Sequence, residues 1–501
     1  LYPLLISIPT LFFIFGATFL LMSILRSQAM TSIILLGYIA VTLFFLSAKF
    51  HYLFDYMALN LPLLYSDFVG FGNLTYILIH RGIYFFSGLS FIFITVLLFR
   101  RLPQSRAATV FCLVLGVFSL AGAAVLGYTH LSRLDEEILL RKQMKALNKE
   151  LAGANVVSVR SCHIDLDHQG QVISAAAALS FTNNTPEAIE RYIFSLNPDL
   201  EVYSVSRSGK QIPYSRDLHI LFVKPENPLE TGSADSLTIF YKGGINEKAC
   251  YLDIDEKIRQ QPYRLSLYSV DKRFGFITEN YVLLTSETLW YPVAGLPAGA
   301  SYPQLQKMDF IRFSLRVKTD PSLKAVAQGA VSEKGPGEFV FSPEVPLPKL
   351  SLVLGEYKTR SITVHDSTTA DSLEYALYLL KGHDYFSEYF PDLEEKLPGL
   401  INELRNQYGN SLALSYPYRR LNIVETPIQF FAYPRLWTLA AETSQPEMVL
   451  LPETGVTLQS ADFRRFSYAM TRMRRSCLLY TSDAADELDG VDLGGRRITK
   501  K

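Results

Sequence analysis

The eight histidines are the most direct indicators of metal or acid–base chemistry in the chain, and their spacing does not fit a zinc peptidase. A zinc peptidase helix needs H-E-x-x-H, because two His four residues apart share one helix face and the Glu activates water. No such spacing occurs in the 501 residues. His163 and His168 lie five apart beside two aspartates, a pattern that favours a polar strand edge over a metal site. His383 lies beside Asp384 at an expected helix break, and we interpret it as structural.

Other catalytic signatures are also missing from the sequence. It contains no G-x-S-x-G nucleophile motif and no phosphate-binding G-x-x-x-x-G-K loop, so ATP hydrolysis by this chain is not indicated. The four cysteines form no C-x-x-C pair, which gives no sign of a redox motif or a cysteine zinc site. Cys162 and Cys250 fall in the same expected domain, where a disulfide and two buried thiols both stay open.

Composition divides the chain into two parts. The charges balance, with 48 basic and 48 acidic residues, so no basic surplus suggests nucleic acid as a partner. The mean hydropathy of +0.15 is high for a soluble enzyme. Its source is the first 131 residues, in which four segments contain no Lys, Arg, Asp or Glu. These segments are Leu4–Leu25, Met30–Ala48, Gly82–Phe99 and Ala107–Leu131.

Each apolar segment is about 18 to 25 residues long, which is the length needed to cross a bilayer. We therefore predict a membrane α-helical bundle of about four spans, since a helix satisfies its own backbone hydrogen bonds in lipid. The aromatic stretch His51–Arg81 is interrupted by Pro62, Gly70 and Gly72. It predicts an interfacial or re-entrant piece packed on the bundle.

The positions of the basic residues predict an orientation. Arg26 in the first loop, and Arg100, Arg101 and Arg106 in the third, favour the cytoplasmic side. This arrangement places the soluble part outside the cytoplasm. The basic residues that follow the last span alternate with acidic ones and predict a solvated helix face; they are Arg133, Arg141, Lys142, Lys145 and Lys149.

After a stalk helix at Leu134–Leu151, the chain alternates apolar and polar residues in short runs separated by turn residues, which predicts an antiparallel β-sandwich or saddle. The expected strands are Val172–Phe181, Tyr192–Leu196, Glu201–Val205, His219–Val223, Ser236–Tyr241, Phe310–Val317, Phe339–Phe341, Lys349–Leu354 and Ser361–Val364. Near residue 370 the pattern changes to α/β, with helices expected at Asp371–Leu380 and Asp392–Tyr408 and an extended segment at Leu421–Glu425.

Three groups of residues carry a family resemblance. They are Trp290-Tyr291-Pro292; then Phe313–Val317, Gly329, Phe339–Phe341, Pro346–Pro348 and Gly355–Tyr357; and finally the segment Tyr416–Pro427. Their order resembles the N-terminal β-domain and the start of the catalytic domain of gluzincin zinc aminopeptidases of the aminopeptidase N type. Membrane spans before such a module resemble bacterial fusions of an ABC transporter permease with an aminopeptidase-like domain. The resemblance implies a multi-pass protein of the bacterial inner membrane with an ATP-binding cassette subunit and a peptide substrate as partners.

The resemblance also implies site residues. In the family, a G-x-M-E-N loop binds the peptide amino terminus through its Glu. The chain reads Gln445-Pro446-Glu447-Met448 at that place, so Glu447, with Gln445 beside it, is the expected equivalent. The Gly and Asn of the pattern are absent, and a surface glutamate is the alternative. Zinc is expected for the full-length parent and not in this chain, which lacks the motif. The alternative function is a non-catalytic peptide- or partner-binding domain of a permease.

The expected domains are 1–131, transmembrane helices; 132–156, stalk; 157–365, aminopeptidase-like β-domain; 366–476, start of a metallopeptidase domain; and 477–501, an artefactual tail. The tail Cys477–Lys501 resembles a translated sequencing adapter. We accordingly expect natural sequence to end near Arg475, before the zinc helix of the family. Because Leu1 is no start methionine, earlier spans are expected to precede it.

Overall fold

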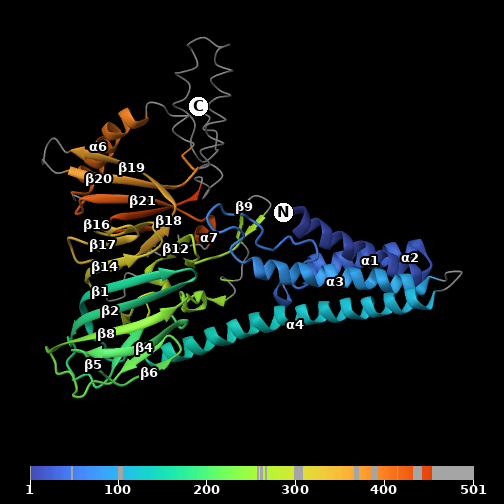
Figure 1. The fold of residues 1–501 in the computed structure, drawn as a ribbon, viewed down its shortest axis with the longest axis horizontal. Coiled ribbons are helices and arrows are strands. Elements are labelled where there is room, and N and C mark those ends of the chain that lie inside the picture. The colour runs from blue at the N-terminus through green and yellow to red at the C-terminus, as the bar shows by residue number, and fades with distance from the viewer. Residues whose placement is uncertain are drawn as a thin grey trace, which may run out of the picture.

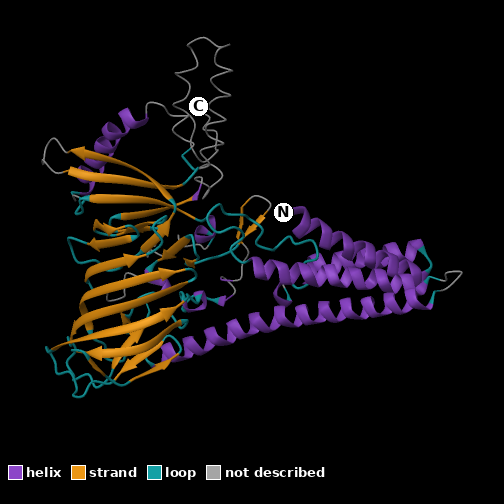
Figure 2. Cartoon of the chain, in the orientation of Figure 1, coloured by secondary structure: helices purple, strands orange, loops and turns teal. Residues whose placement is uncertain are grey.

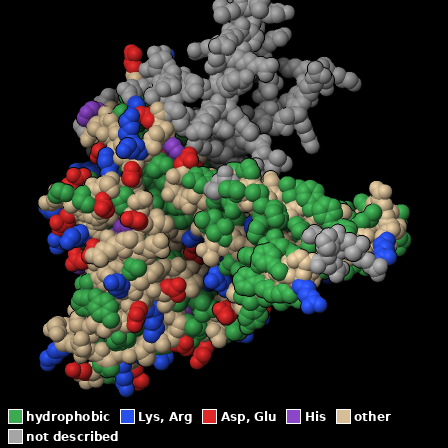
Figure 3. Space-filling model, turned by 45° about the vertical axis from the view of Figure 1, so that its right-hand side comes forward, with side chains coloured by type: hydrophobic (Ala, Val, Ile, Leu, Met, Phe, Trp, Pro, Cys, Tyr) green, Lys and Arg blue, Asp and Glu red, His purple; other side chains and the backbone are tan. Residues whose placement is uncertain are grey.

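The chain folds into an elongated helical part joined to a stack of β-sheets (Figure 1). The computed structural model describes residues 2–46, 49–99, 105–256, 259, 263–265, 268–297, 309–365, 372–384, 393–413, 416–432 and 443–453. Hydrophobic side chains cover the helical part, whereas charged side chains are spread over the β-rich part (Figure 3). The expected tail and the end of natural sequence near Arg475 lie outside the described residues.

Four helices are long and apolar enough to cross a membrane. A π-helical turn, η1 (Pro3–Ser7), leads into α1 (Ile8–Leu25); α2 (Gln28–Val41) continues into η2 (Thr42–Leu46); α3 (Leu74–Leu98) and α4 (Arg106–Glu150) follow. The side chains of Ser27, Asn73 and Ser105 each accept a hydrogen bond from a first-turn backbone N–H, which fixes where α2, α3 and α4 begin.

Helix α3 begins eight residues earlier than its apolar run suggests, at Leu74 and not at Gly82. Arg81 lies inside the helix and is buried. Its guanidinium donates to the carbonyl oxygens of Leu5 and Tyr56 and to the hydroxyl of Thr10. A charged residue marks the end of an apolar run in sequence. Here, however, η1, the first turn of α1 and the chain after Tyr52 supply acceptors that allow Arg81 to be buried.

The α1–α3 contact depends on two glycines. A Cβ on Gly16 would lie 2.4 Å from the carbonyl oxygen of Gly88, and a Cβ on Gly88 would lie 2.3 Å from the carbonyl carbon of Phe12. Small residues at such crossings allow two helix backbones to approach closely, which is how apolar helices associate without a hydrophobic driving force.

Gly88→Ala is therefore expected to push α1 from α3 and lower the thermal unfolding temperature of the full chain in detergent, at a cost of about 1–3 kcal/mol for overpacking. Gly37→Ala is the matched control, because no atom lies within 4 Å of its added Cβ. Equal unfolding temperatures for the two variants would contradict the close crossing.

Helix α4 is one continuous helix of 45 residues that carries the chain from the apolar part into the β-rich part. At about 1.5 Å per residue it spans roughly 68 Å. The predicted stalk Leu134–Leu151 is thus its second half and not a separate element. Met144 is fully buried there against Ala249, Leu252 and Leu289.

The β-rich module contains three packed sheets around one core (Figure 2). An eight-stranded sheet has the order β16-β17-β14-β1-β2-β8-β4-β5, and two four-stranded sheets have the orders β11-β12-β18-β15 and β13-β3-β7-β6. The bounds are β1 (Ser158–Gln169), β2 (Val172–Thr182), β3 (Tyr192–Ser195), β4 (Leu200–Arg207), β5 (Lys210–Gln211), β6 (Tyr214–Asp217), β7 (Ile220–Val223), β8 (Ala234–Gly243), β11 (Phe276–Ile277), β12 (Tyr281–Leu284), β13 (Val293–Ala294), β14 (Arg312–Lys318), β15 (Lys324–Ala327), β16 (Ala330–Gly335), β17 (Glu338–Ser342) and β18 (Leu352–Gly355).

Burial alternates along β1 and β2, so one face of the large sheet lies against the core. The module is β-rich, as the sequence predicts. One pairing departs from the antiparallel prediction, because β1 pairs with β14 in parallel. Short elements complete the module: η4 (Glu247–Ala249), η5 (Ser286–Thr288), and the hairpin of β9 (Tyr263–Leu265) and β10 (Tyr268–Val270). A 3-10 turn, η3 (Phe50–Tyr52), lies between η2 and α3 in the helical part.

A five-stranded sheet follows, with the order β19-β20-β21-β23-β22. Its elements are β19 (Tyr357–His365), β20 (Ser372–Leu380), α6 (Leu393–Leu412), β21 (Arg420–Thr426), α7 (Ile428–Phe431), β22 (Ser444–Gln445) and β23 (Met448–Pro452). The predicted helix at Asp371–Leu380 is wrong, since the described part of that segment is strand β20. Its buried residues Leu373, Ala376 and Leu379 are three apart, a spacing that resembles a helix face, but pairing with β19 and β21 decides the structure.

Candidate functional site

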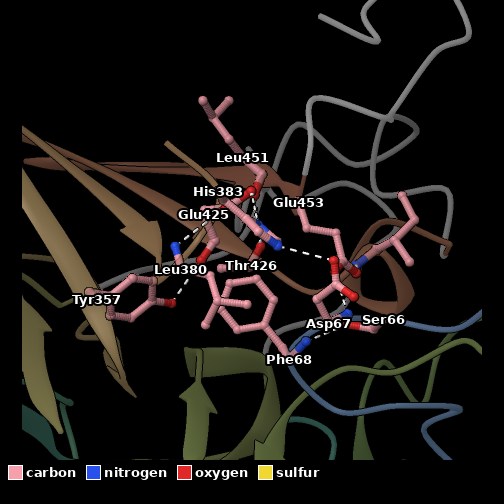
Figure 4. A network of polar contacts seen from close by, with 11 residues as sticks. Ser66, Asp67, Phe68, Tyr357, Leu380, His383, Glu425, Thr426, Leu451 and Glu453 are labelled. Atoms are coloured by element: carbon pink, nitrogen blue, oxygen red, sulfur yellow. Dashed lines mark hydrogen bonds and ion pairs between the residues drawn. The ribbon is translucent and has the colours of Figure 1, made fainter. Parts of the chain in front are cut away.

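Three titratable side chains meet at one edge of the five-stranded sheet (Figure 4). Strands β20, β21 and β23 are neighbours and run parallel, so their carboxyl ends reach the same edge. His383 follows β20, Glu425 lies near the end of β21, and Glu453 follows β23. Ligands of open α/β sheets bind beyond the carboxyl ends of strands, so this edge is the natural place to look for a site.

His383 is buried between two carboxylates. Its Nδ1 lies 2.9 Å from Oε1 of Glu425, and its Nε2 lies 3.1 Å from Oδ2 of Asp67. The second oxygen of Glu425 accepts the backbone N–H of Leu380 at 2.8 Å. Burial lowers the pKa of His383, but the hydrogen bonds and charges of Glu425 and Asp67 outweigh it, so the net pKa is raised. The arrangement therefore favours the imidazolium form, in which both ring nitrogens donate.

Glu453 links two backbone segments. Its Oε1 accepts the N–H of Ile428 at 2.7 Å, and its Oε2 accepts the N–H of Asp67 at 2.8 Å. Burial raises the pKa of Glu453 to about 7, although the hydrogen bonds from Ile428, Ser66 and Asp67 oppose that shift. This carboxyl group therefore changes its charge near neutral pH.

The loop of residues 60–72, which joins η3 to α3, inserts into this edge of the sheet. The ring of Phe68 lies 4.9 Å from that of Tyr281 and 6.1 Å from those of Tyr357 and His383. Phe68 and Val69 also pack on the hydrophobic cluster that Tyr281 and Tyr357 share with the sheet. The predicted interfacial piece is thus bound to the β-rich module as well as to the helices.

Polar contacts extend this attachment. Leu64 donates its N–H to the carbonyl of Ser269 at 3.2 Å. Gln429 donates Nε2 to the carbonyl of Gly70 at 3.0 Å, and Arg273 donates Nη1 to the carbonyl of Gly72 at 3.0 Å. The loop is therefore held by hydrogen bonds to its own main chain along its length, in addition to the acidic cluster.

Metal binding does not suit this arrangement. Both ring nitrogens of His383 point at carboxylates, which leaves no lone pair for a metal while the imidazolium form persists. Among the residues that the structure describes, no group of three or more His, Cys, Asp or Glu side chains has metal-binding geometry. The side chains of this cluster can exchange protons, and they hold the loop of residues 60–72 on the sheet.

The two residues that the resemblance assigns to peptide binding lie at the other end of β23. Glu447 is buried, and its Oε2 accepts the N–H of Gly329 from the β-rich module at 2.5 Å. Gln445 accepts hydrogen bonds from Gln328 at 2.9 Å and Ser351 at 2.7 Å. Burial raises the pKa of Glu447, against the Gly329 hydrogen bond and the charge of Arg420. Both side chains thus join the sheet to the module.

The other candidate residues from the sequence, apart from the exposed His163, pack in hydrophobic clusters or form internal hydrogen bonds. Cys162 and Cys250 are both free and buried, and they belong to separate hydrophobic clusters, so no disulfide joins them in this structure. His168 hydrogen-bonds Thr319 at 3.0 Å and the carbonyl of Gly170 at 2.9 Å. His163 is on the exposed side of β1.

Sequence reasoning missed the cluster of His383, Glu425, Glu453 and Asp67. One feature of the sequence could have indicated it, because a polar or acidic residue stands at or just beyond the end of each of three apolar runs. It was not used for His383 because Asp371–Leu380 was interpreted as a helix, which hides the strand end that His383 follows. No local pattern marks Asp67 as the fourth member.

No family model and no curated protein matches the chain. Solved structures similar to it include an M1 zinc metallopeptidase from Deinococcus radiodurans, as a mutant bound to a Tyr-Ser-Ala substrate, with 16% identity and a TM-score of 0.41. That match covers 55% of this chain and 57% of the other. Aminopeptidase A from Legionella pneumophila, in complex with aspartic acid, has 11% identity and a TM-score of 0.39 and is covered over 30% of its length. The chain thus spans little more than half of the first of these proteins.

Proposed function

We propose that this chain is the permease-linked, membrane-anchored part of an aminopeptidase-like protein, without the catalytic zinc motif. Its four apolar helices hold the β-rich module at a bacterial inner membrane, with the module outside the cytoplasm. The parent protein uses zinc and acts on peptides, and its permease part works with an ATP-binding cassette subunit. The support for peptidase likeness is the order of Trp290–Pro292, the strands that follow, and Tyr416–Pro427 in the sequence.

The observation that carries the proposal is the junction between the β-rich module and the five-stranded sheet. The segment Tyr416–Pro427 provides β21 at the centre of that sheet, and the Gln445–Met448 segment forms the turn before β23. Glu447 lies in this turn with a left-handed φ of 58° and contacts Gly329 of the module. The Tyr416–Pro427 segment also contacts the module, since Arg420 donates to the carbonyl of Gly329 at 3.0 Å and Asn422 to that of Ala327 at 3.2 Å.

A second function, a non-catalytic peptide- or partner-binding domain of a permease, is favoured by the partners of Glu447. A carboxylate that receives a peptide ammonium needs a free oxygen in a cleft. Here Oε2 of Glu447 is used by Gly329 and the side chain is buried. Gln445 is likewise satisfied by Gln328 and Ser351. These internal contacts favour a scaffold role for the two residues.

A peptidase assay tests the proposal. The full chain in detergent, supplied with zinc and an aminoacyl reporter substrate, is expected to give only the hydrolysis of a protein-free blank, because no H-E-x-x-H is present to hold zinc and activate water. Hydrolysis that depends on the chain and is removed by a chelator would refute the missing-motif argument.

The same preparation separates peptide binding from partner binding. Binding of a dipeptide with a free amino terminus, measured by calorimetry, supports peptide recognition if N-acetylation and Glu447→Gln both abolish it. Glu333→Gln is the matched control, because that glutamate is exposed on β16. Absence of binding in the unmodified chain favours the partner-binding function.

A further inference from the structure

A cavity of about 350 Å³ lies where the helices meet the β-rich module. Helix α3 contributes its first turns through Asn73, Tyr76 and Ile79. Helix α4 contributes residues spaced three or four apart, which places them on one helix face directly after its apolar stretch; these are His130, Arg133, Leu134, Glu137, Ile138 and Arg141.

The rings of Tyr76 and His130 show where the cavity lies along the helices. Their centroids are 5.3 Å apart, so the start of α3 and the end of the apolar part of α4 lie at one level. The cavity therefore lies at the boundary between the apolar and polar parts of the molecule.

The cavity lining carries more positive than negative charge. Its basic residues are Arg133, Arg141, Lys248, Arg259 and Lys272, and its acidic residues are Glu137, Glu256 and Asp271. Two of the acids are matched inside the cavity, since Glu137 lies 2.6 Å from Lys248 and Glu256 lies 3.2 Å from Arg141.

The guanidinium of Arg259 contacts two neutral groups, and the ammonium of Lys272 lies 2.8 Å from the Arg259 carbonyl. The Nη1 of Arg259 donates to the carbonyl of Cys250 at 3.0 Å, and its guanidinium lies 5.3 Å from the ring centre of Phe274. Arg133 is exposed and lines the cavity from α4. The amino terminus of α3 adds the positive end of a helix dipole at Asn73. These three features together favour an anionic group in the cavity.

The apolar lining argues against a small free anion as the occupant. Pro62, Ile79, Leu134, Ile138 and Val270 line the cavity beside the charged residues. The neighbouring surfaces of α3 and α4 also expose large apolar side chains, including Leu78 and Val125. An amphipathic anion would use both kinds of surface, whereas inorganic phosphate would use only the charged one.

We propose that this cavity binds the phosphate-bearing headgroup of an anionic membrane lipid, with its acyl chains along α3 and α4. Arg133 and Arg259 contact the phosphate, and the lipid bridges the helices to the module. The inference rests on the proposed membrane anchoring, because it places the cavity at the headgroup layer. It adds a ligand that joins the two parts of the protein.

The test uses the full chain extracted from nanodiscs of phosphatidylcholine mixed with phosphatidylglycerol, with retained lipid measured by native mass spectrometry. Phosphatidylglycerol is expected to be retained in preference to phosphatidylcholine. Arg133→Gln and Arg259→Gln are each expected to weaken its retention about fivefold, which corresponds to about 1 kcal/mol for a basic residue near a membrane surface. Lys142→Gln, an exposed neighbour that does not line the cavity, is the control and should leave retention unchanged.

Three results would overturn the assignment: equal retention of both lipids, an equal loss for Lys142→Gln, or displacement of phosphatidylglycerol by the same concentration of inorganic phosphate, which identifies a free-anion site. Arg133 is exposed, so its variant tests the proposal even if Arg259→Gln misfolds. Flotation of the chain with liposomes distinguishes membrane anchoring from lipid binding in the cavity. A chain that does not float contradicts the membrane anchoring itself, whereas a chain that floats without lipid preference contradicts the cavity proposal alone.

Discussion

Arg141→Ala is expected to detach the end of α4 from the β-rich module. The guanidinium of Arg141 is buried and donates to the carbonyl oxygens of Lys248 at 2.9 Å, Cys250 at 3.0 Å and Ile254 at 3.3 Å, and also to that of Tyr251. Its Nε lies 3.2 Å from Glu256. Alanine leaves these buried acceptors without their donor, at a cost of about 3 kcal/mol.

A native thiol reports this detachment. Cys250 is fully buried and provides one of the carbonyls that Arg141 binds. In a Cys112→Ser, Cys477→Ser background, Arg141→Ala is expected to raise the rate at which a maleimide labels Cys250 on the order of 100-fold, since local opening costs about 3 kcal/mol less. Cys162, buried in the core of the sandwich, should keep its slow rate and serves as the internal reference.

Two controls sharpen the experiment. Lys142→Ala removes a neighbouring exposed cation and should leave the labelling of Cys250 unchanged. Arg141→Lys keeps the charge but cannot reach several carbonyls at once, so its effect should be intermediate. If Cys162 and Cys250 are labelled equally fast in Arg141→Ala, the module has unfolded as a whole and the local attachment is disproved.

The helical part follows from composition because each helix satisfies its own backbone groups and needs only an apolar run of sufficient length. The boundary at Leu74 could not be predicted in this way. Arg81 is tolerated inside α3 only because the carbonyls of Leu5 and Tyr56 come close enough to bind it. That contact depends on how α1 crosses α3, which no local pattern specifies.

The β-rich module was predictable where one face of a strand is buried and the other is exposed, as in β2. Strand β20 does not show that alternation, so its type depends on pairing with β19 and β21. The cluster at the sheet edge was less predictable still. It needs three parallel strand ends and Asp67, which is separated from His383 by 316 residues of sequence. Long-range pairings of this kind leave little trace in local periodicity.

The helical part and the module meet at two separate attachments. Helix α4 is fixed by Arg141 to the segment that follows η4, while the loop of residues 60–72 is fixed by Phe68 and Asp67 to the five-stranded sheet. A change in the angle between α3 and α4 would therefore act on both the sandwich and the sheet. The loop attachment differs from the other because Glu453, which holds the loop, changes its charge near neutral pH.

The loop attachment is expected to weaken as the pH rises from about 5 to 8. The pKa of Glu453 is raised from 4.5 to about 7 by burial, so the folded state holds the proton more tightly than the unfolded chain. The stability from this group is fully present below pH 4.5 and is lost as the pH rises through 7. A shift of this size corresponds to about 3 kcal/mol. The raised pKa of His383 acts with the same sign, since its stability is full below pH 6.5 and is lost above its raised pKa.

Hydrogen exchange of the backbone amides of Asp67 and Ile428 measures this weakening, because both donate to Glu453. After correction for the intrinsic pH dependence of exchange, their protection should fall between pH 5 and 8. Glu453→Gln keeps an acceptor oxygen but cannot ionise, so it should flatten the profile and leave only the fall due to His383. Glu279→Gln, an exposed acid beyond β11, should reproduce the unmodified profile. If protection in Glu453→Gln falls as steeply as in the unmodified chain, another group is responsible, and Glu453 does not control how the loop is held on the sheet.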